Sequence, residues 1–307
     1  MIFARDVANP EGPVLLGDGS WAVTEMDLGS ITEFSADGSV RWTVAKTGRP
    51  NGLALDTDGN LWVAESEDQA LLRVSPNGEI TTIARGPSDL PFLWPNDLCF
   101  GPDGALYMTD SGVPLAAFEG IDPPEAAYDV SVDGRVYRID PVSGECEVLD
   151  RGLQFANGIA WGPGGHQLYV SETLTGNIYR YKLEGARLVG ERNLFANVMR
   201  SAPKSYGRTA GPDGMAFDEE GRLYVTVLGQ GDIAVVETEG DVRHYLEVPG
   251  DLPTNVAFAG AGERRLLLTE GSFGQLVMVE VPAPRLDLFD GNTTGAVPAS
   301  HDEGEIR

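Results

Sequence analysis

Short apolar runs alternate with Gly-rich turns along this chain, in a unit that occurs six times. Each unit begins with a polar residue, continues into an apolar run, turns at a dipeptide such as Asp58-Gly59, and ends in a second apolar or aromatic run. The clearest copies are Asn51 to Glu65, Asn96 to Asp110, Asn157 to Glu172 and Asp213 to Val227, and weaker copies begin at Glu11 and Asn255. Asp-Gly between apolar runs supplies the positive φ angles of a tight reversal, so each unit is predicted to be a β-hairpin.

A third apolar run follows each predicted hairpin. These runs span Ser30 to Phe34, Ala70 to Val74, Arg135 to Ile139, Asn177 to Tyr181, Asp232 to Val236 and Gln275 to Val279. Weaker fourth runs come next, as at Val40 to Val44 and Glu147 to Leu149. Four antiparallel strands repeated every 40 to 61 residues are typical of a β-propeller. We therefore expect an all-β chain that folds as a six-bladed β-propeller of four-stranded antiparallel blades.

The two ends of the chain are expected to behave differently. The segment Ile2 to Val7 precedes the first unit, and pairing with the outer edge of the last blade would close the ring and hide a sheet edge. The length of 307 residues alone suggests two domains, but the repeat predicts one propeller domain over residues 1–290. Residues 291–307 are small, polar and acidic, and are predicted to be a tail without regular structure.

The first position of every unit carries an amide or a carboxyl group. The six residues are Glu11, Asn51, Asn96, Asn157, Asp213 and Asn255. Because the first strands of a propeller surround its central channel, these side chains are expected to form a ring at one mouth of the channel. Such a ring favours a binding site, although it also fits a channel entrance that is merely solvated.

A second set of acidic residues ends the second strand of the units. Its members are Glu25, Glu65, Asp110, Glu172 and Glu270, and Val227 breaks the pattern in the fifth unit. An Asn that offers its oxygen to a cation needs an acceptor for its NH₂ group, and we expect these carboxylates to supply it. The alternative is a set of exposed strand ends that happen to be acidic.

Oxygen ligands without imidazole or thiolate favour a hard cation. We expect one divalent cation, Ca²⁺ first, with Mg²⁺, Mn²⁺ or Zn²⁺ as the alternatives. The three histidines, His166, His244 and His301, fall in a turn, an outer strand and the tail. A structural zinc site and a Ser-His-Asp hydrolase therefore lack the residues they require.

Two long insertions are predicted to emerge at the same mouth as the polar ring. Residues 111–133 separate the second and third strands of the third unit and are expected to cover the mouth as a lid. The connection from the fourth to the fifth blade gathers Arg200, Lys204 and Arg208, a cationic cluster in an acidic chain. Long loops on one face of a rigid scaffold usually carry binding residues, but variation of a solvated surface explains them too.

Charge narrows the range of partners. The chain has 22 basic and 47 acidic side chains, a net charge of −25 that repels nucleic acid and anionic lipid surfaces. Neither a long apolar run nor the features of a signal peptide is present, so we expect a cytoplasmic protein, a monomer or small homo-oligomer with a small-molecule substrate. Cys99 and Cys146 fall on an inner and an outer strand of one blade, too far apart for a disulfide, and are expected to be free thiols.

Three blocks of sequence, together with EGPV at Glu11, resemble the SMP-30/gluconolactonase family of six-bladed, metal-dependent hydrolases. The blocks are WPNDLCFGPDGALYMTD from Trp94, FANGIAWGPGGHQLYVSET from Phe155 and GPDGMAFDEEGRLYVT from Gly211. Diisopropylfluorophosphatase and the paraoxonases look like more distant relatives. The resemblance covers the chain from Glu11 to about Val281, and its most specific part is the ordered set Glu, Asn, Asn, Asp on different blades.

The resemblance implies a role for individual residues. The catalytic cation would be held by Glu11, Asn157 and Asp213, with Asn96 as a further ligand or substrate contact. Asp213 would also activate the attacking water, which makes it the candidate catalytic residue. Asn51 matches the ring position without a shared ligand role and is placed with the substrate-binding candidates.

Substrate binding is expected to involve Asn96, Asn51, Trp94 and Arg208. The arginine and serine that many family members carry before the Asn of the third unit are replaced here by Phe92, Leu93, Trp94 and Pro95. The resemblance implies a gluconolactonase-like activity, and this apolar approach also admits a more hydrophobic lactone in place of a polyhydroxylated sugar lactone.

The predicted activity is metal-dependent hydrolysis of a lactone. Three alternatives stay open: hydrolysis of a phosphoester, phosphofluoridate or aryl ester at the same site, a strictosidine-synthase-like enzyme, and a non-catalytic propeller that binds a ligand. The four residues Glu11, Asn96, Asn157 and Asp213 favour the hydrolase, because a binding module does not require them together.

Overall fold

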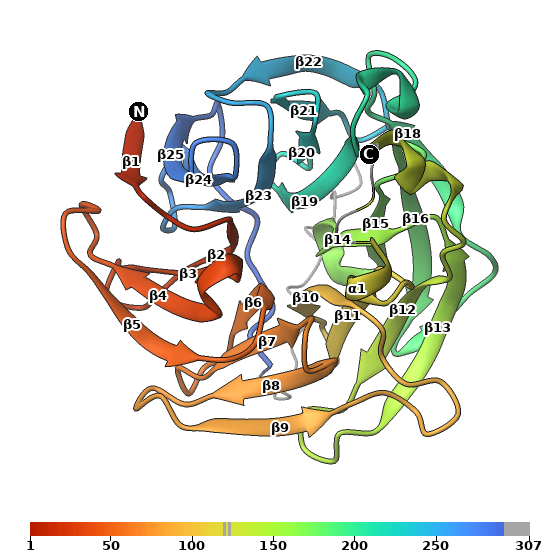
Figure 1. The fold of residues 1–307 in the computed structure, drawn as a ribbon, viewed down its shortest axis with the longest axis horizontal. Helices are drawn as coiled ribbons and strands as arrows, with labels where there is room; N and C mark the ends of the chain where they lie inside the picture. The colour runs from red at the N-terminus through yellow and green to blue at the C-terminus, as the bar shows by residue number, and fades with distance from the viewer. Residues whose placement is uncertain (119–120, 122–123, 292–307) are drawn as a thin grey trace, which may run out of the picture.

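The fold is that of a six-bladed β-propeller, as expected from the repeat. The computed structural model describes residues 1–118, 121 and 124–291. Six antiparallel sheets stand around a central channel, and each runs from an innermost strand at the channel to an outermost strand at the rim (Figure 1).

The first three blades follow one another without interruption. From the channel outward, blade 1 consists of β2 (Pro10–Leu15), β3 (Trp21–Glu25), β4 (Ser30–Phe34) and β5 (Arg41–Lys46). Blade 2 consists of β6 (Pro50–Leu55), β7 (Leu61–Glu65), β8 (Ala70–Val74) and β9 (Ile80–Ala84). Blade 3 consists of β10 (Pro95–Phe100), β11 (Leu106–Asp110), β12 (Gly134–Ile139) and β13 (Cys146–Leu153).

The last three blades contain two departures from simple order. Blade 4 consists of β14 (Ala156–Trp161), β15 (Gln167–Glu172) and β16 (Asn177–Glu184), with β18 (Asn193–Asn197) as the outer strand and the short β17 (Arg187–Leu188) beside it. Blade 5 consists of β19 (Gly211–Phe217), β20 (Leu223–Leu228), β21 (Asp232–Val236) and β22 (Val242–Glu247). Blade 6 consists of β23 (Pro253–Phe258), β24 (Arg265–Glu270), β25 (Gln275–Glu280) and the N-terminal β1 (Ile2–Arg5).

The N-terminal strand closes the ring as predicted. β1 pairs antiparallel with β25, with Ile2 opposite Val277 and Arg5 opposite Gln275. The backbone N–H of Val7 then donates to the carbonyl of Gly274 at 3.0 Å. The N-terminal segment and the last repeat unit thus share the sheet of blade 6, and β1 covers the edge of β25.

Blade 2 illustrates why the repeat folds into hairpins. Gly59 has a φ of 80°, which an L side chain rarely adopts, and its N–H donates to the carbonyl of Asp56. The Asp56 carboxylate accepts the N–H groups of Asp58 and Asn60 and the indole N–H of Trp62. Turn and strand are therefore tied together by one acidic side chain.

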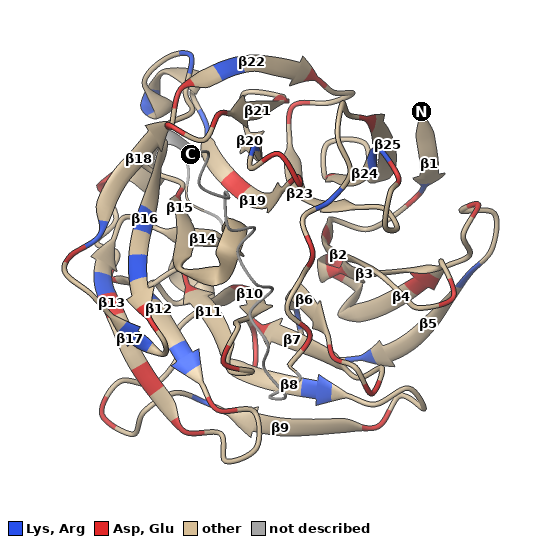
Figure 2. Ribbon diagram, turned by 180° about the vertical axis from the view of Figure 1, so that it is seen from behind, with Lys and Arg blue, Asp and Glu red and all other residues tan. Residues whose placement is uncertain are grey.

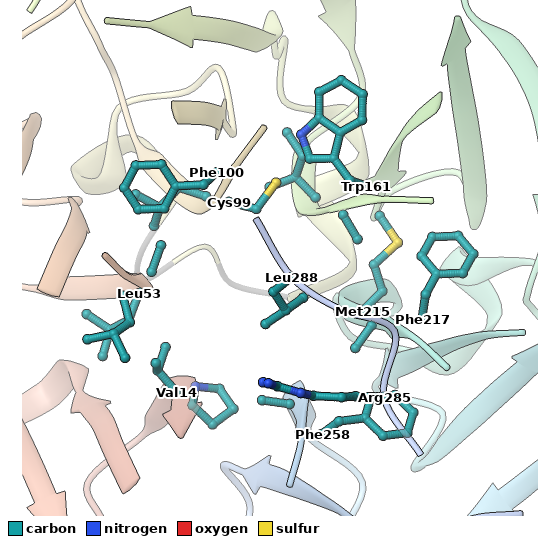
Figure 3. A pocket seen from close by; sticks show the side chains of 18 of the residues that line it. Val14, Leu53, Cys99, Phe100, Trp161, Met215, Phe217, Phe258, Arg285 and Leu288 are labelled. Carbon is teal, nitrogen blue, oxygen red and sulfur yellow. The ribbon is translucent and has the colours of Figure 1, made fainter. Parts of the chain in front are cut away.

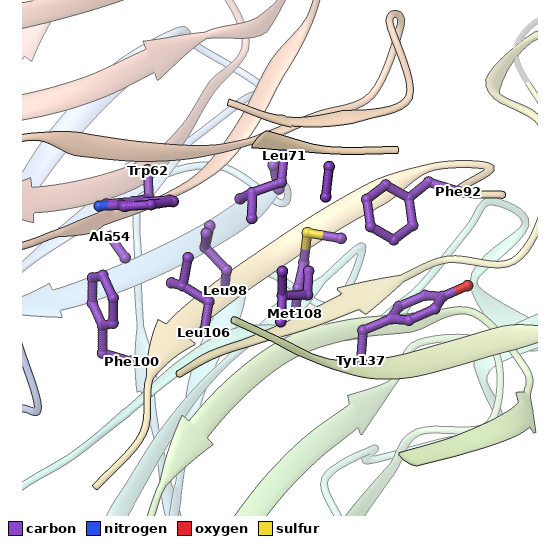
Figure 4. Packing of buried hydrophobic residues seen from close by; sticks show 12 residues of the cluster. Ala54, Trp62, Leu71, Phe92, Leu98, Phe100, Leu106, Met108 and Tyr137 are labelled. Carbon is purple, nitrogen blue, oxygen red and sulfur yellow. The ribbon is translucent and has the colours of Figure 1, made fainter. Parts of the chain in front are cut away.

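Apolar side chains fill the space between neighbouring blades. Between blades 2 and 3, Trp62 meets Phe100 edge-on with ring centroids 5.9 Å apart, and Leu71, Leu98 and Met108 pack beside them (Figure 4). Such wedges between blades hold the inner strands at fixed positions around the channel.

A segment that the repeat did not predict crosses the far mouth of the channel. After β25, residues 284–290, here called the floor segment, pass from blade 5 to blade 2. The N–H of Leu286 donates to the Phe217 carbonyl at 3.1 Å, and the N–H of Thr57 donates to the Asp290 carbonyl at 3.3 Å. The predicted tail, apart from Gly291, lies outside the described residues.

Helices are few and short. α1 (Leu115–Phe118) and the 3₁₀ turn at Pro124–Asp129 belong to the insertion in blade 3, and another 3₁₀ turn lies at Pro203–Tyr206. Within residues 1–118, 121 and 124–291, no helix is long and apolar enough to cross a membrane.

Candidate metal centre

Five of the six predicted ring residues occupy the same place at the start of their innermost strands. They are Glu11, Asn51, Asn96, Asn157 and Asp213, and each is at most 6 % exposed. The residue before each of them pairs with the last residue of the second strand, as Pro95 does with Asp110 and Pro212 does with Val227. The propeller thereby brings residues that are about 200 positions apart in sequence to one mouth.

A change of register accompanies the ring in every blade. The pairing between the first and second strands shifts, as at a β-bulge, between Glu11 and Val14 in blade 1 and at the corresponding place in the other five. A bulge bends a strand and turns a side chain away from the regular alternation. The repeated shift explains how polar side chains at this level face the channel while the residues that follow return to the apolar pattern.

The sixth ring position was assigned one residue too late. Pro253 pairs with Glu270 as Pro50 pairs with Glu65, so the residue equivalent to Asn51 is Thr254 rather than Asn255. The hairpin of blade 6 has a longer turn than that of blade 2, and counting from the apolar run placed the ring position incorrectly. Asn255 lies one step farther along β23.

The positions one residue beyond the ring form a second layer of side chains in the channel, which the sequence analysis did not predict. Asn255 and Asp97 occupy equivalent positions on opposite blades, and the side chain of Asn255 is hydrogen-bonded to the carboxylates of Asp97 and Glu11. The neighbouring blades have glycine there and make room for them: a Cβ on Gly52 would lie 2.4 Å from Asp97 Oδ1, and one on Gly214 would lie 2.0 Å from Asn255 Oδ1. The sequence feature that marks Asp97 is Asn-Asp where three other blades have Asn-Gly or Asp-Gly.

Three buried carboxylates consequently face one another. Burial, and then the charge of Asp97, raise the pKa of Glu11 to about 8. Burial raises the pKa of Asp97 to about 6. The pKa of Asp213 is raised well above its usual range by burial and by the charges of Glu11 and Asp97, against hydrogen bonds from Asn157 and Gly214. Their ionised forms repel one another at the channel mouth (Figure 2 shows the acidic position on β19).

This donor set fits a hard divalent cation. In the part of the chain that the structure describes, none of the three carboxylates has a Lys, Arg or His within ion-pair distance. The same part contains no group of three or more His, Cys, Asp or Glu side chains placed to hold a metal, so amide oxygens must complete a site here. Carboxylate and amide oxygens without soft ligands suit Ca²⁺ best.

Hydroxyl groups, and not the predicted carboxylates, hold the amides of the ring. Asn96 Nδ2 donates to Ser111 Oγ at 2.9 Å, and Asn157 Nδ2 donates to Thr173 Oγ1 at 3.1 Å. Both acceptors directly follow the acidic residue that ends the second strand. The Asn157 amide also donates to the Asp213 carboxylate. An amide whose N–H groups are held by neighbouring acceptors keeps its oxygen available to a cation.

The carboxylates that end the second strands accept hydrogen bonds from backbone N–H groups of the adjacent loops. Asp110 accepts the N–H groups of Leu93, Trp94 and Gly112 at 2.7 to 3.2 Å. Glu270 likewise accepts backbone N–H groups from the loops beside it. The prediction that this set orients the ring is wrong, because buried loop N–H groups need acceptors and these carboxylates supply them.

A further series of hydroxyls fixes the backbone of the ring from the adjacent blade. Thr24 donates to the carbonyl of Asn51 at 2.8 Å, Ser171 to that of Asp213 at 3.0 Å, and Thr226 to that of Thr254 at 2.8 Å. Thr109 donates to the carbonyl of Asn157 in the same manner. A hydroxyl residue just before the strand-end position is the sequence feature that could have revealed this.

Trp94 lies beside the ring in an aromatic cluster. Its ring meets those of Phe118 and Phe155 with centroids 5.8 and 5.3 Å apart, and its indole N–H is buried without a partner. Phe155 has a φ of 71°, which is rare for a bulky residue. Phe92, by contrast, is fully buried in the core between blades 2 and 3.

The predicted lid lies over this cluster. Val113 and Val132 are buried against Trp94, and the Tyr128 hydroxyl accepts the N–H of Ala210 at 2.9 Å. α1 stands near the channel over blades 3 and 4 (Figure 1). Residues 119–120 and 122–123 of the insertion lie outside the described residues.

The predicted cationic cluster is neutralised residue by residue. Arg208 pairs with Asp251 at 2.6 Å, Lys204 with Asp129 at 3.0 Å and Arg200 with Asp232 at 2.8 Å. Contact of Arg208 with a substrate therefore stays a prediction. The two cysteines, in contrast, are free as expected.

Comparison with known proteins agrees with this geometry. The family described as the SMP-30/Gluconolactonase/LRE-like region matches residues 10–272. The chain belongs to the SMP-30/gluconolactonase/LRE-like family. Its similarity to individual members of this family and its neighbours is moderate.

Two curated relatives cover most of the chain. A gluconolactonase of Zymomonas mobilis is 27 % identical over 280 residues, which are 85 % of this chain and 76 % of the relative. A diisopropyl-fluorophosphatase of Loligo vulgaris is 25 % identical over 274 residues, 83 % of each chain. Among solved structures, the calcium-binding protein regucalcin of Agrobacterium tumefaciens has the same fold, with a TM-score of 0.72, 21 % identity and coverage of 92 % of this chain and 94 % of that one.

Proposed function

We propose that this protein is a metal-dependent lactonase. Glu11, Asn96, Asn157 and Asp213 would hold one divalent cation, Ca²⁺ in the first place, with Mg²⁺, Mn²⁺ or Zn²⁺ as alternatives. The observation that carries the proposal is the convergence of buried Glu11 and Asp213 with the amides of Asn96 and Asn157, without an ion-pair partner for either carboxylate among the described residues. The names of the Zymomonas gluconolactonase and of calcium-binding regucalcin support it.

The residues of the chain divide the reaction between them. When bound, the cation would polarise the lactone carbonyl and stabilise the negative charge that develops on its oxygen. Asp213 accepts a proton from the attacking water, whose oxygen bonds to the carbonyl carbon. The ring C–O bond breaks, the leaving oxygen takes up a proton, and a hydroxy acid is released. Asn96 would contact the substrate, and Glu11 and Asp213 would supply two negative charges that balance a divalent ion.

The surroundings favour a lactone with an apolar substituent. Trp94, Phe118 and Phe155 form an aromatic cluster, and Trp94 and Phe155 lie two residues before Asn96 and Asn157 in the sequence. Asn51 and Arg208 are further candidates for substrate contact.

A pH-indicator assay tests the proposal. Aldonolactones, aliphatic and aromatic lactones, and aryl esters would be compared with protein that is metal-loaded, treated with a chelator, and reloaded. We expect acid release that the chelator abolishes and metal restores, and that Asp213→Asn lowers by at least about a hundredfold, the usual effect of losing a general base. The exposed turn residue Asp37 gives a matched control, Asp37→Asn, which should keep full activity.

Two results would favour a different function for the protein. Absence of acid release from metal-bound protein with every substrate would favour a ligand-binding propeller. The relative in Loligo vulgaris favours phosphofluoridate hydrolysis as a second candidate, and fluoride release from diisopropyl fluorophosphate without lactone turnover would favour that activity.

A further inference from the structure

The channel contains a cavity on the side away from the candidate metal centre. It has a volume of about 310 Å³ and is lined mainly by the innermost strands, with Leu53, Met215 and Phe258 among its apolar walls (Figure 3). Ile159 lines it as well. The floor segment closes part of its far end, where Leu288 lines the cavity and is also 73 % exposed. The cavity is therefore accessible from the face opposite the metal centre, and its size lies at the lower end of small-molecule pockets.

Arg285 places a cation in this apolar space. The floor segment carries it inward, its backbone paired with Asp218 and its side chain lying across the cavity beside Val14 and Phe258 (Figure 3). Its Nε is buried without a hydrogen-bond partner, and within residues 1–118, 121 and 124–291 its guanidinium enters no ion pair. A guanidinium cannot lose its proton in a protein, so this charge has to be compensated by water or by a ligand.

The lining favours an anion with a single charge. The roof holds Asp97 and Asn255, which are already hydrogen-bonded to each other, and the floor segment adds Asp287 and Asp290, both exposed to solvent. Arg285 is the one Lys or Arg among the lining residues. The indole N–H of Trp161, another lining residue, is likewise buried without a partner.

We propose that this cavity is a second ligand site, for a small amphipathic monocarboxylate. The carboxylate would accept hydrogen bonds from the guanidinium of the half-buried Arg285, a charge-assisted pair that offsets the cost of its unpartnered Nε. The aliphatic or aromatic body would lie against Ile159, Met215 and Phe258. A dianion such as phosphate would leave one charge unpaired in an apolar wall, which disfavours it.

Calorimetric titration with hexanoate tests this site. Wild-type protein should bind one hexanoate per chain, with or without a chelator, because none of the four proposed cation ligands lines the cavity. 1-Hexanol, which has the same body and no charge, should bind at least about tenfold more weakly, and so should hexanoate to Arg285→Met. The exposed Arg187 on β17 supplies a matched control, and Arg187→Met should bind hexanoate as the wild type does.

A second variant keeps the test decisive if Arg285→Met folds poorly. Ala216 lines the cavity, and Ala216→Phe fills it while leaving Arg285 in place. This variant should lose hexanoate binding. Lack of saturable binding to the wild type in the millimolar range, equal binding of hexanoate and 1-hexanol, or undiminished binding to either cavity variant would each overturn the proposal. Inorganic phosphate binding in preference to hexanoate would overturn the assigned ligand class.

Discussion

At the residue scale, the ring combines groups that oppose folding unless a cation is bound. Glu11, Asp97 and Asp213 all have raised pKa values because burial and mutual repulsion disfavour their charged forms. Buried polar groups that cost stability are typical of binding sites, and two of these three carboxylates, Glu11 and Asp213, are proposed ligands.

This cost predicts the effect of Glu11→Gln on metal-free protein. The pKa of Glu11 rises from 4.5 to about 8 on folding, so the folded state retains a proton that the unfolded state loses above about pH 5. Stability of the wild type should therefore fall as the pH rises from about 5 to 8, and Glu11→Gln should be more stable than the wild type at pH 8 by ~2 kcal/mol or more, but not at pH 5.

Urea unfolding of chelator-treated protein at the two pH values measures this difference. Glu191 is exposed in a loop, and Glu191→Gln is expected to change the free energy of unfolding at neither pH. A Glu11→Gln variant with wild-type stability at pH 8 would show that Glu11 carries no such penalty.

The sequence predicts a site residue only where a local pattern marks its position in the repeat unit. Glu11, Asn96, Asn157 and Asp213 were identified because each begins a recognisable unit. Asn255 was misplaced by one position, since the turn of its hairpin is longer and a shift of one residue moves a side chain to another level. The role of Asp97 depends on contact with the opposite blade, which no local pattern contains.

At the scale of elements, closure of the ring rests on β1. The strand covers the edge of β25, and Ala4 and Val7 are buried against blades 1 and 6. The pairing of β1 with β25 was predictable from the sequence, because an apolar segment precedes the first unit and the last unit supplies only three strands of its own. The floor segment could not be predicted from the repeat, because none of the other blades has an equivalent segment.

Removal of residues 1–7 should therefore destabilise the propeller. Loss of the buried Ala4 and Val7 and of the β25 pairing predicts a decrease in the free energy of unfolding on the order of 3 kcal/mol. The exposed edge should also promote association between chains. Thermal unfolding and light scattering measure both effects, and an unchanged unfolding temperature in a monomeric truncated protein would contradict the role given to β1.

At the scale of the whole molecule, the propeller separates two ends of one channel. One mouth gathers carboxylates and amides from five blades, and the other end holds Arg285 of the floor segment. The repeat made the architecture predictable, since six hairpins need a closed ring to bury their faces. The net charge of −25 is spread over all blades, and only a few of its acids belong to the site (Figure 2).

The central claim is that the four ring residues bind one divalent cation, and calcium titration of chelator-treated protein by calorimetry tests it most directly. We expect one Ca²⁺ per chain for the wild type and for Asp37→Asn, and at least about a hundredfold weaker binding for Asp213→Asn, which removes one of two balancing charges. Absence of saturable Ca²⁺, Mg²⁺, Mn²⁺ or Zn²⁺ binding to the wild type, or unchanged affinity in Asp213→Asn, would contradict the account.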